Sequence, residues 1–298
     1  MTGYEALREG VAWLDLSERG RFRARGRDRA RLLHAMTTNH IKQMNPGDSC
    51  YAFFLNAQGR IQGDVQLLAI EDYFLLDTEP GTHETLFRHL NKYIIADDVT
   101  LEDAREDLAA IGVEGPRSEA VLARAQGGIH APFTATGGAG GRIYVPPAEK
   151  AGLIAQLEEL GAVRAGAEDA NVARLEHFHP RFGADITEKS LVHETQLLHA
   201  VHFNKGCYLG QEIIERVRSR GMVHRHLVPL YVEGTEPPPP ESDVKAGETV
   251  VGKTMSSAHS PALHKCIAFA YVRTEHAKPG TALTVNGVPA EVAAAKGV

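Results

Sequence analysis

The 298-residue chain carries 32 Lys and Arg against 38 Asp and Glu, a formal net charge of −6, and 43% of its residues are hydrophobic. These values are typical of a globular protein of about two domains, and they exclude a disordered chain, a collagen and a disulfide scaffold. The sequence lacks both a run of about 18 apolar residues and a basic, apolar leader, so we expect no membrane span and a cytoplasmic location. The mild acidity argues against nucleic acid as a partner, because phosphate contacts need an excess of Lys and Arg.

The first 160 residues alternate between strand and helix patterns. Residues 22–25 alternate as a strand does, and Asp28 precedes an amphipathic run that predicts a helix capped by its side chain. Residues 51–55 and 61–70 flank the turn cluster 56–59 and predict a β-hairpin. Further patterns follow as strand 73–76, a helix through 86–93, strand 108–113, helix 117–125, strand 142–145 and helix 147–160. The alternation predicts an α+β fold in which helices pack on largely antiparallel sheets.

After residue 221 the composition changes to short apolar strands separated by turn residues. These strands cover 227–232, 249–251, 266–272 and 283–285. They predict a small β-barrel, with the four prolines 237–240 in a surface loop because proline cannot donate to a sheet. We therefore expect two domains, 1–221, subdivided near 105 and 165, and 222–298. The glycine cluster 137–141 predicts a flexible loop, because it lacks the spacing and ending of a phosphate loop.

The segment 203–221 contains the highest density of chemically useful residues. Gln211 begins an amphipathic helix, so Cys207 lies just before a helix amino terminus. The positive helix end and the nearby Lys205 both favour the thiolate, which is the nucleophilic form of cysteine. Glycines on either side of the cysteine let the backbone approach a ligand closely. Cys207 is thus a candidate reactive thiol, although from the local pattern alone a buried packing cysteine is an equal alternative.

Other cysteines, histidines and arginines offer further candidates. Cys50 and Cys266 lie in apolar strand patterns, where we expect buried thiols in a reducing compartment. The two His-x-His pairs, at 177/179 and 224/226, have no second cluster at a structural-zinc spacing, so we predict no metal site. Arginine occupies every second position from 19 to 31. We expect these arginines to form a solvated rim, and a phosphate-binding face is the alternative.

Several motifs together resemble one family. Residues 205–212, Lys-Gly-Cys-Tyr-Leu-Gly-Gln-Glu, are similar to the KGCYxGQE signature of YgfZ-type folate-binding proteins. Those proteins are relatives of the glycine-cleavage T-protein and act in iron-sulfur cluster assembly or repair. Arg174-Leu-Glu176 is similar to the R-x-E motif of the family. Residues 26–30 resemble the G-x-D element of the family, 37–39 its TTN element and 55–60 its turn. Residues 251–257, 260–263 and 268–271 resemble its barrel.

The resemblance implies a ring of α+β subdomains plus the barrel, enclosing a central channel for tetrahydrofolate or a derivative. It implies that Glu176 holds the pterin ring, because a carboxylate can accept a pair of hydrogen bonds from the N–H groups of that ring. The residues assigned to the cofactor are then Glu176, Arg174, Tyr208 and Gln211. The resemblance also makes Cys207 the reactive thiol beside Lys205, with iron-sulfur client or assembly proteins as partners. From the residues alone, a surface ion pair between Arg174 and Glu176 is the simpler interpretation.

A true transferase is the main alternative. In the glycine-cleavage T-protein, aminomethyl transfer relies on an Asp after a Gly-Gly turn, where the sequence often reads Asp-Asp. The present chain has Gly63 in place of the first acid and keeps Asp64, and the sequence leaves open which position carries the role. The T-protein also has Asn near 75–78 and lacks the cysteine of the present motif. These departures favour the YgfZ-type function over a folate-dependent aminomethyltransferase or methyltransferase using Asp64, and they leave open whether the protein is an enzyme. A nucleic-acid-binding module is the third alternative.

Overall fold

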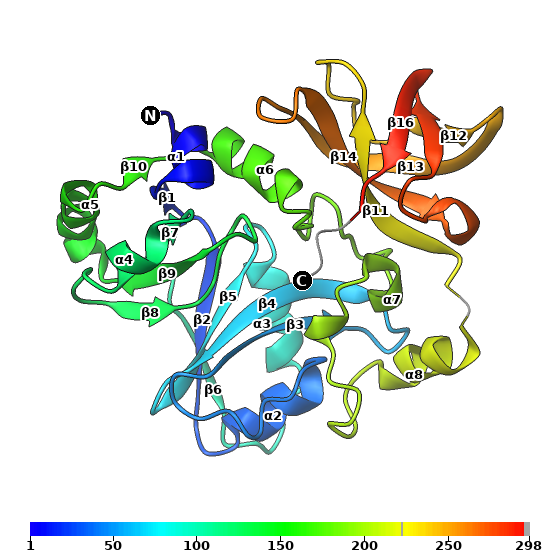
Figure 1. Cartoon of the computed structure of the whole chain (residues 1–298). Coiled ribbons are helices and arrows are strands. Elements are labelled where there is room, and N and C mark those ends of the chain that lie inside the picture. Colours follow the sequence, from blue (N-terminus) through cyan, green and yellow to red (C-terminus); the bar gives the residue numbers. More distant parts are fainter. Residues whose placement is uncertain (222, 295–298) are drawn as a thin grey trace.

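The computed structural model describes residues 1–221 and 223–294 (Figure 1). Within these ranges the strands form two five-stranded sheets and one closed six-stranded barrel. The barrel lies at one end of the molecule, and helix α6 (Ala167–Glu176) runs from helix α1 (Gly3–Glu9) toward it. The predicted α+β fold with a carboxy-terminal barrel is confirmed.

One sheet has the strand order β3-β4-β5-β2-β6 and is antiparallel. Its strands are β2 (Gly20–Arg25), β3 (Ser49–Leu55), β4 (Ile61–Ala69), β5 (Tyr73–Thr78) and β6 (Thr100–Asp103). Helices α2 (Arg29–Met36) and α3 (His83–Asn91) cover one face, where Val65 and Leu67 join the buried core. Because side chains alternate along a strand, Asp64 lies on the opposite face, toward the centre of the molecule. The β3–β4 hairpin that the turn cluster predicts is therefore confirmed.

The second sheet has the strand order β10-β1-β7-β9-β8. Its strands are β1 (Ala12–Asp15), β7 (Ala109–Glu114), β8 (Ile129–Ala131), β9 (Gly140–Val145) and β10 (Val163–Arg164). Strands β1 and β10 are parallel, and the other pairings are antiparallel. Helices α4 (Ser118–Leu122) and α5 (Lys150–Glu159) are shorter than predicted. The start of the predicted second helix forms a separate 3₁₀ turn, η1 (Pro147–Glu149).

Short helices connect this part of the chain to the barrel. They are α7 (Val192–Thr195), η2 (Leu198–Ala200) and α8 (Gln211–Arg220). The barrel comprises β11 (Arg225–Val232), β12 (Asp243–Ala246), β13 (Thr249–Ser260), β14 (Lys265–Arg273), β15 (Ala282–Val285) and β16 (Val288–Val292), with η3 (Thr274–His276) after β14. The predicted domain boundary falls at Met222, which lies outside the described residues. None of the helices in 1–221 and 223–294 combines the length and apolar character needed to cross a bilayer.

Two expectations about the first strand and helix are wrong. Arg19 and Arg21 are buried rather than solvated. Their guanidinium groups find acceptors inside the protein, because Arg19 pairs with Asp77 at 2.5 Å and Arg21 donates to the carbonyl of Ser17 at 2.8 Å. Farther along the series the arginines pair with carboxylates: Arg23 with Asp107, Arg25 with Glu102, Arg27 with Asp98 and Arg31 with Asp97. Five of the seven arginines thus form ion pairs, and Arg21 and Arg29 donate to backbone carbonyls, so the series is not a free cationic face.

The Asp28 side chain also differs from the prediction. It makes no capping hydrogen bond to α2. Its Oδ2 instead accepts from the amide of Asp98 at 2.9 Å, which ties the start of α2 to the loop before β6.

Candidate functional site

A narrow polar cavity of about 10 Å³ lies at the centre of the molecule. Its lining residues are Arg19, Tyr51, Asp64, Gln66, Asp77, Glu79, Thr134, Ala135, His179, Pro180 and Arg181. A larger cavity, of about 100 Å³, shares Arg19, Glu79, Ala135 and Arg181 with it. A third, of about 190 Å³, shares Tyr51, Gln66, Thr134 and His179 with it. We call these three adjoining cavities the channel.

The β3–β4 hairpin decides which of positions 63 and 64 faces the channel. Asp64 lines the central cavity. A side chain at Gly63 would place its Cβ 2.8 Å from Cδ1 of Leu86, on the side of the sheet that α3 covers. An acid at position 63 would therefore point into the apolar core, whereas Asp64 points into the channel.

Asp64 is buried with half of its carboxylate unsatisfied. The hydroxyl of Tyr51 donates to Oδ2 at 2.9 Å, and Oδ1 has no hydrogen-bond partner within the described part of the chain. Burial and the nearby Glu79 raise the pKa of Asp64 to about 7, and Arg19 acts in the opposite direction. The group can thus gain or lose a proton near neutral pH, and its Oδ1 can accept a hydrogen bond from a ligand.

Asp77 is a second carboxylate in the channel, and both of its oxygens are bonded to other side chains of the protein. It pairs with Arg19 at 2.5 Å and with Arg142 at 2.6 Å, and it accepts from the hydroxyl of Tyr144 at 2.6 Å. Burial opposes its ionisation, but the charges of Arg142 and Arg19 outweigh burial and keep the pKa of Asp77 below the ordinary value. Because β5 belongs to one sheet and β9 to the other, this cluster fixes the two sheets beside Asp64.

Glu176 lies away from the channel lining, at the end of α6. Its Oε1 accepts from the hydroxyls of Tyr4 and Ser260, each at 2.5 Å, and its Oε2 pairs with Arg8. The carboxylate therefore joins α1, α6 and β13. It lines none of the three channel cavities.

The other residue of the R-x-E motif has different partners. Arg174 is buried, pairs with Asp185 at 2.7 Å and donates to Ser256 at 2.8 Å. It lines the channel cavity of about 100 Å³. The simple surface ion pair between Arg174 and Glu176 is thus excluded, because each residue has its own partner and both are buried.

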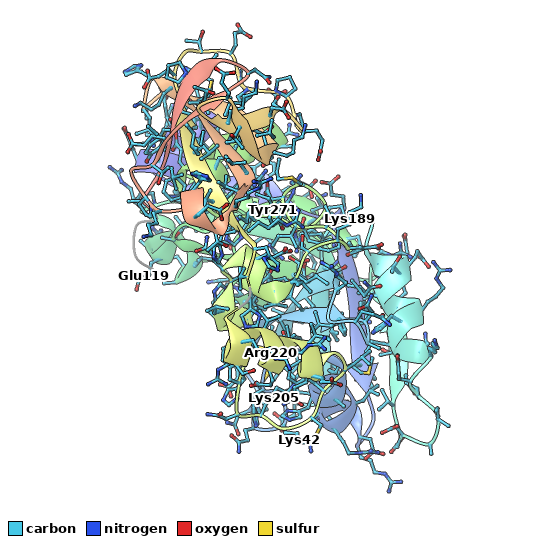
Figure 2. All side chains as sticks on the ribbon, turned by 90° about the vertical axis from the view of Figure 1, so that its right-hand side faces the viewer. Lys42, Glu119, Lys189, Lys205, Arg220 and Tyr271 are labelled. Carbon is cyan, nitrogen blue, oxygen red and sulfur yellow. The ribbon has the colours of Figure 1, made fainter. Side chains whose placement is uncertain are left out.

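The predicted residues around Cys207 form a separate group beside α2 and α8. Lys205 is only 7% exposed, and its Nζ donates to the carbonyls of Thr37, at 2.6 Å, and His34. Burial lowers the pKa of Lys205 to about 7. The two hydrogen bonds from Nζ stabilise the carboxyl end of α2, which is a role that the sequence does not predict. In the view of Figure 2, Lys205 lies between Arg220 and Lys42.

Cys207 itself is exposed on this loop. Helix α8 begins at Gln211, as predicted, and Gln211 is half-buried. Tyr208 is buried, and its ring lies 4.8 Å from the Nζ of Lys205. Burial raises the pKa of Tyr208 to about 12. The thiol is thus presented to solvent between two buried side chains.

The other two cysteines contrast with Cys207. Cys266 is buried in β14. Cys50 lines the channel cavity of about 190 Å³, and burial raises the pKa of its thiol to about 12, although the charge of Lys205 opposes this shift.

Sequence reasoning missed most of the channel residues, among them Tyr51, Glu79 and His179. Tyr51 could have been found from the hairpin register, which pairs it with Gln66. Gln66 is two positions after Asp64 on β4, so the side chains of all three residues lie on the same face of the sheet. Glu79 and His179 carry no such local signal. His179 is brought to the channel by the turn after α6, and burial lowers its pKa to about 4, so it faces the channel as a neutral ring.

Comparison with solved structures defines the class of fold. The crystal structure of the glycine cleavage system aminomethyltransferase T from Bartonella henselae matches 98% of this chain and 87% of its own, with a TM-score of 0.89 and 20% identity. The arrangement of two sheets plus a barrel is therefore the fold of that aminomethyltransferase.

Two family models then identify the family. The GCVT N-terminal domain matches residues 2–136, and the glycine cleavage T-protein C-terminal barrel domain matches 225–296. These ranges cover more than half of the chain, which belongs to the glycine cleavage T-protein family.

Curated relatives agree with this assignment. The aminomethyltransferase of Rubrobacter xylanophilus is 27% identical over 91% of this chain and 78% of its own length. A chloroplastic protein of Arabidopsis thaliana, described as a transferase, is 26% identical over 97% of this chain and 72% of its own length.

Proposed function

We propose that the protein binds tetrahydrofolate or a derivative in the channel and supports iron-sulfur cluster assembly or repair through Cys207. The observation that carries the proposal is the exposed thiol of Cys207 in its KGCYxGQE motif, held between the buried Lys205 and Tyr208. Family membership supports the folate site, and the motif resemblance supports the iron-sulfur role. Client or assembly proteins are the partners that this function requires.

The residues of the channel fit a folate. The unpartnered Oδ1 of Asp64 is an acceptor of the kind that the N–H groups of a pterin need. Arg181 and Arg174 line the adjoining cavity, where a cation would suit the carboxylates of the folate tail. Glu176 would have to exchange its bonds to Tyr4 and Ser260 before it could accept from a pterin, so we assign the first pterin contact to Asp64.

One experiment separates the two parts of this proposal. Cys207→Ser should bind tetrahydrofolate as the wild type does in calorimetry, yet fail to restore iron-sulfur enzyme activity in cells lacking the protein. Cys266→Ala, which removes a cysteine from the barrel core, is the control and should complement. Full complementation by Cys207→Ser would refute the iron-sulfur role of the thiol.

Aminomethyl or methyl transfer is a second candidate, favoured by one observation. Asp64 faces the channel, and its pKa is about 7, so it could move a proton at Oδ1 during transfer of a one-carbon group. Relatives named aminomethyltransferase support this reading. An assay of one-carbon transfer with tetrahydrofolate as acceptor tests it: turnover that disappears in Asp64→Asn and persists in Cys207→Ser would establish the transferase.

A further inference from the structure

The loop that carries Cys207 is held against helix α2 on both sides of the thiol. We call residues 204–210 the Cys207 loop. Before the thiol, Lys205 Nζ donates to the carbonyl of Thr37 at 2.6 Å. After it, the amide of Leu209 donates to the carbonyl of Ala35 at 3.0 Å. The end of α2 therefore sets the position of the loop.

His34, in the last turn of α2, contacts the same loop through its ring. The ring is buried, and its Nδ1 accepts from the amides of Ile41 at 3.2 Å and Lys42 at 3.4 Å. An atom that accepts two amide hydrogens carries no proton, so the proton of the neutral ring is on Nε2. Nε2 lies 2.8 Å from the carbonyl of Lys205 and donates to it. The hydrogen bonds thus fix one tautomer.

The groups that face this ring are basic. The His40 ring lies edge-on with its centroid 4.6 Å away, and Lys42 and Lys205 are the neighbouring cations. Burial lowers the pKa of His34, and these three groups act in the same direction, while the hydrogen bond to the Lys205 carbonyl opposes them. A second proton, on Nδ1, would face the two amide donors of Ile41 and Lys42.

We propose that neutral His34 is a positioning residue for Cys207, holding the Cys207 loop on α2 through the carbonyl of Lys205. The proposal rests on the proposed function in that it treats Cys207 as the reactive thiol. It adds a residue from a different segment, one that touches neither the thiol nor the channel. Protonation of His34 would remove the acceptor at Nδ1 but leave the Nε2 donor to the Lys205 carbonyl in place.

A matched pair of variants tests the proposal. His34→Gln keeps an amide donor near the Nε2 position, whereas His34→Asn keeps an acceptor near Nδ1 but does not reach Lys205. Hydrogen exchange at pH 7.5 should show about tenfold faster exchange at the Leu209 amide in His34→Asn, as expected for one lost hydrogen bond, and a smaller change in His34→Gln. Amides of β14 serve as the internal control. Equal changes in both variants, or no change in His34→Asn, would overturn the proposal.

Acidification of the wild type provides a test that does not depend on a variant folding. Nε2 donates to the carbonyl of Lys205 in both the neutral and the protonated ring, so protection of the Leu209 amide, corrected for intrinsic exchange, should persist between pH 7 and pH 5. The amides of Ile41 and Lys42 should instead lose protection once Nδ1 gains a proton. Loss of protection at Leu209 over this range would contradict the proposal. These measurements report the order of the loop in the purified protein, whereas complementation by Cys207→Ser reports the role of the thiol. The positioning role of His34 can therefore be refuted while the proposed function stands, and the proposed function can be refuted while the positioning role stands.

Discussion

Two buried carboxylates of this protein, Asp64 and Glu176, differ in how their oxygens are used. Glu176 has three donors, from Tyr4, Arg8 and Ser260, and connects α1, α6 and the barrel. Asp64 has one, from Tyr51, and its other oxygen has no partner in 1–221 and 223–294. An unsatisfied buried oxygen destabilises a fold, so its presence in a cavity indicates a ligand contact, whereas the satisfied carboxylate indicates a structural role.

The largest effect should come from Asp64→Asn. The substitution keeps the shape and removes the charge, so charge-assisted hydrogen bonds to the folate should weaken by about 1.5–3 kcal/mol, or roughly 10- to 150-fold in Kd. Calorimetric titration with tetrahydrofolate measures this change. Asp72→Asn, at an exposed position, is the matched control. Equal affinity of the Asp64→Asn variant and the wild type would place the pterin elsewhere.

Glu176→Gln should show the opposite pattern. Loss of the charge weakens the bonds to Arg8 and Tyr4, and we expect a decrease of about 1–2 kcal/mol in the free energy of unfolding, since Arg8 is partly exposed. The Kd for tetrahydrofolate should change less than threefold. Denaturant unfolding and calorimetry on the same preparation measure both quantities. A stable variant with strongly weakened binding would show that Glu176 holds the pterin, as the R-x-E resemblance implies.

Tyr51→Phe should have a smaller effect on binding. It removes the only donor that the described residues give Asp64, so it raises the pKa of the acid further and leaves less of the carboxylate ionised at pH 7. We expect tetrahydrofolate to bind about 2- to 10-fold more weakly at pH 7, the usual range for one hydrogen bond. Tyr73→Phe, outside the channel, is the control. Recovery of affinity at pH 9 would support the ionisation argument, and a loss independent of pH would contradict it.

The stability of the protein should also depend on pH. The pKa of Asp64 is raised to about 7 in the folded protein, above its unfolded value near 4, so the folded state binds the proton more tightly. The stability of the wild type relative to Asp64→Asn should therefore be greatest below pH 4, fall as the pH rises toward 7 and then stay constant. Paired denaturant titrations from pH 4 to pH 8 measure this difference. A difference that is constant with pH would show that Asp64 titrates normally.

Local patterns were sufficient to predict the hairpin that carries Asp64 and the helix that begins at Gln211. In both cases the signal, a turn cluster or an amphipathic period, lies within about ten residues. The partners of the buried charges could not be predicted, because they are distant in sequence: Glu176 meets Tyr4 from 172 residues earlier, and Lys205 meets Thr37 from 168 residues earlier. The same distance explains why Arg19 was expected at the surface, since its partner Asp77 lies on another strand.

The central claim, that ionised Asp64 contacts the folate, is tested most directly by the protons exchanged on binding. Calorimetry with tetrahydrofolate at pH 7, in two buffers of different ionisation enthalpy, gives the number of protons released per bound ligand. Because the pKa of Asp64 is about 7, the account predicts release of about half a proton from the wild type and none from Asp64→Asn. Identical proton release from the two proteins would contradict it.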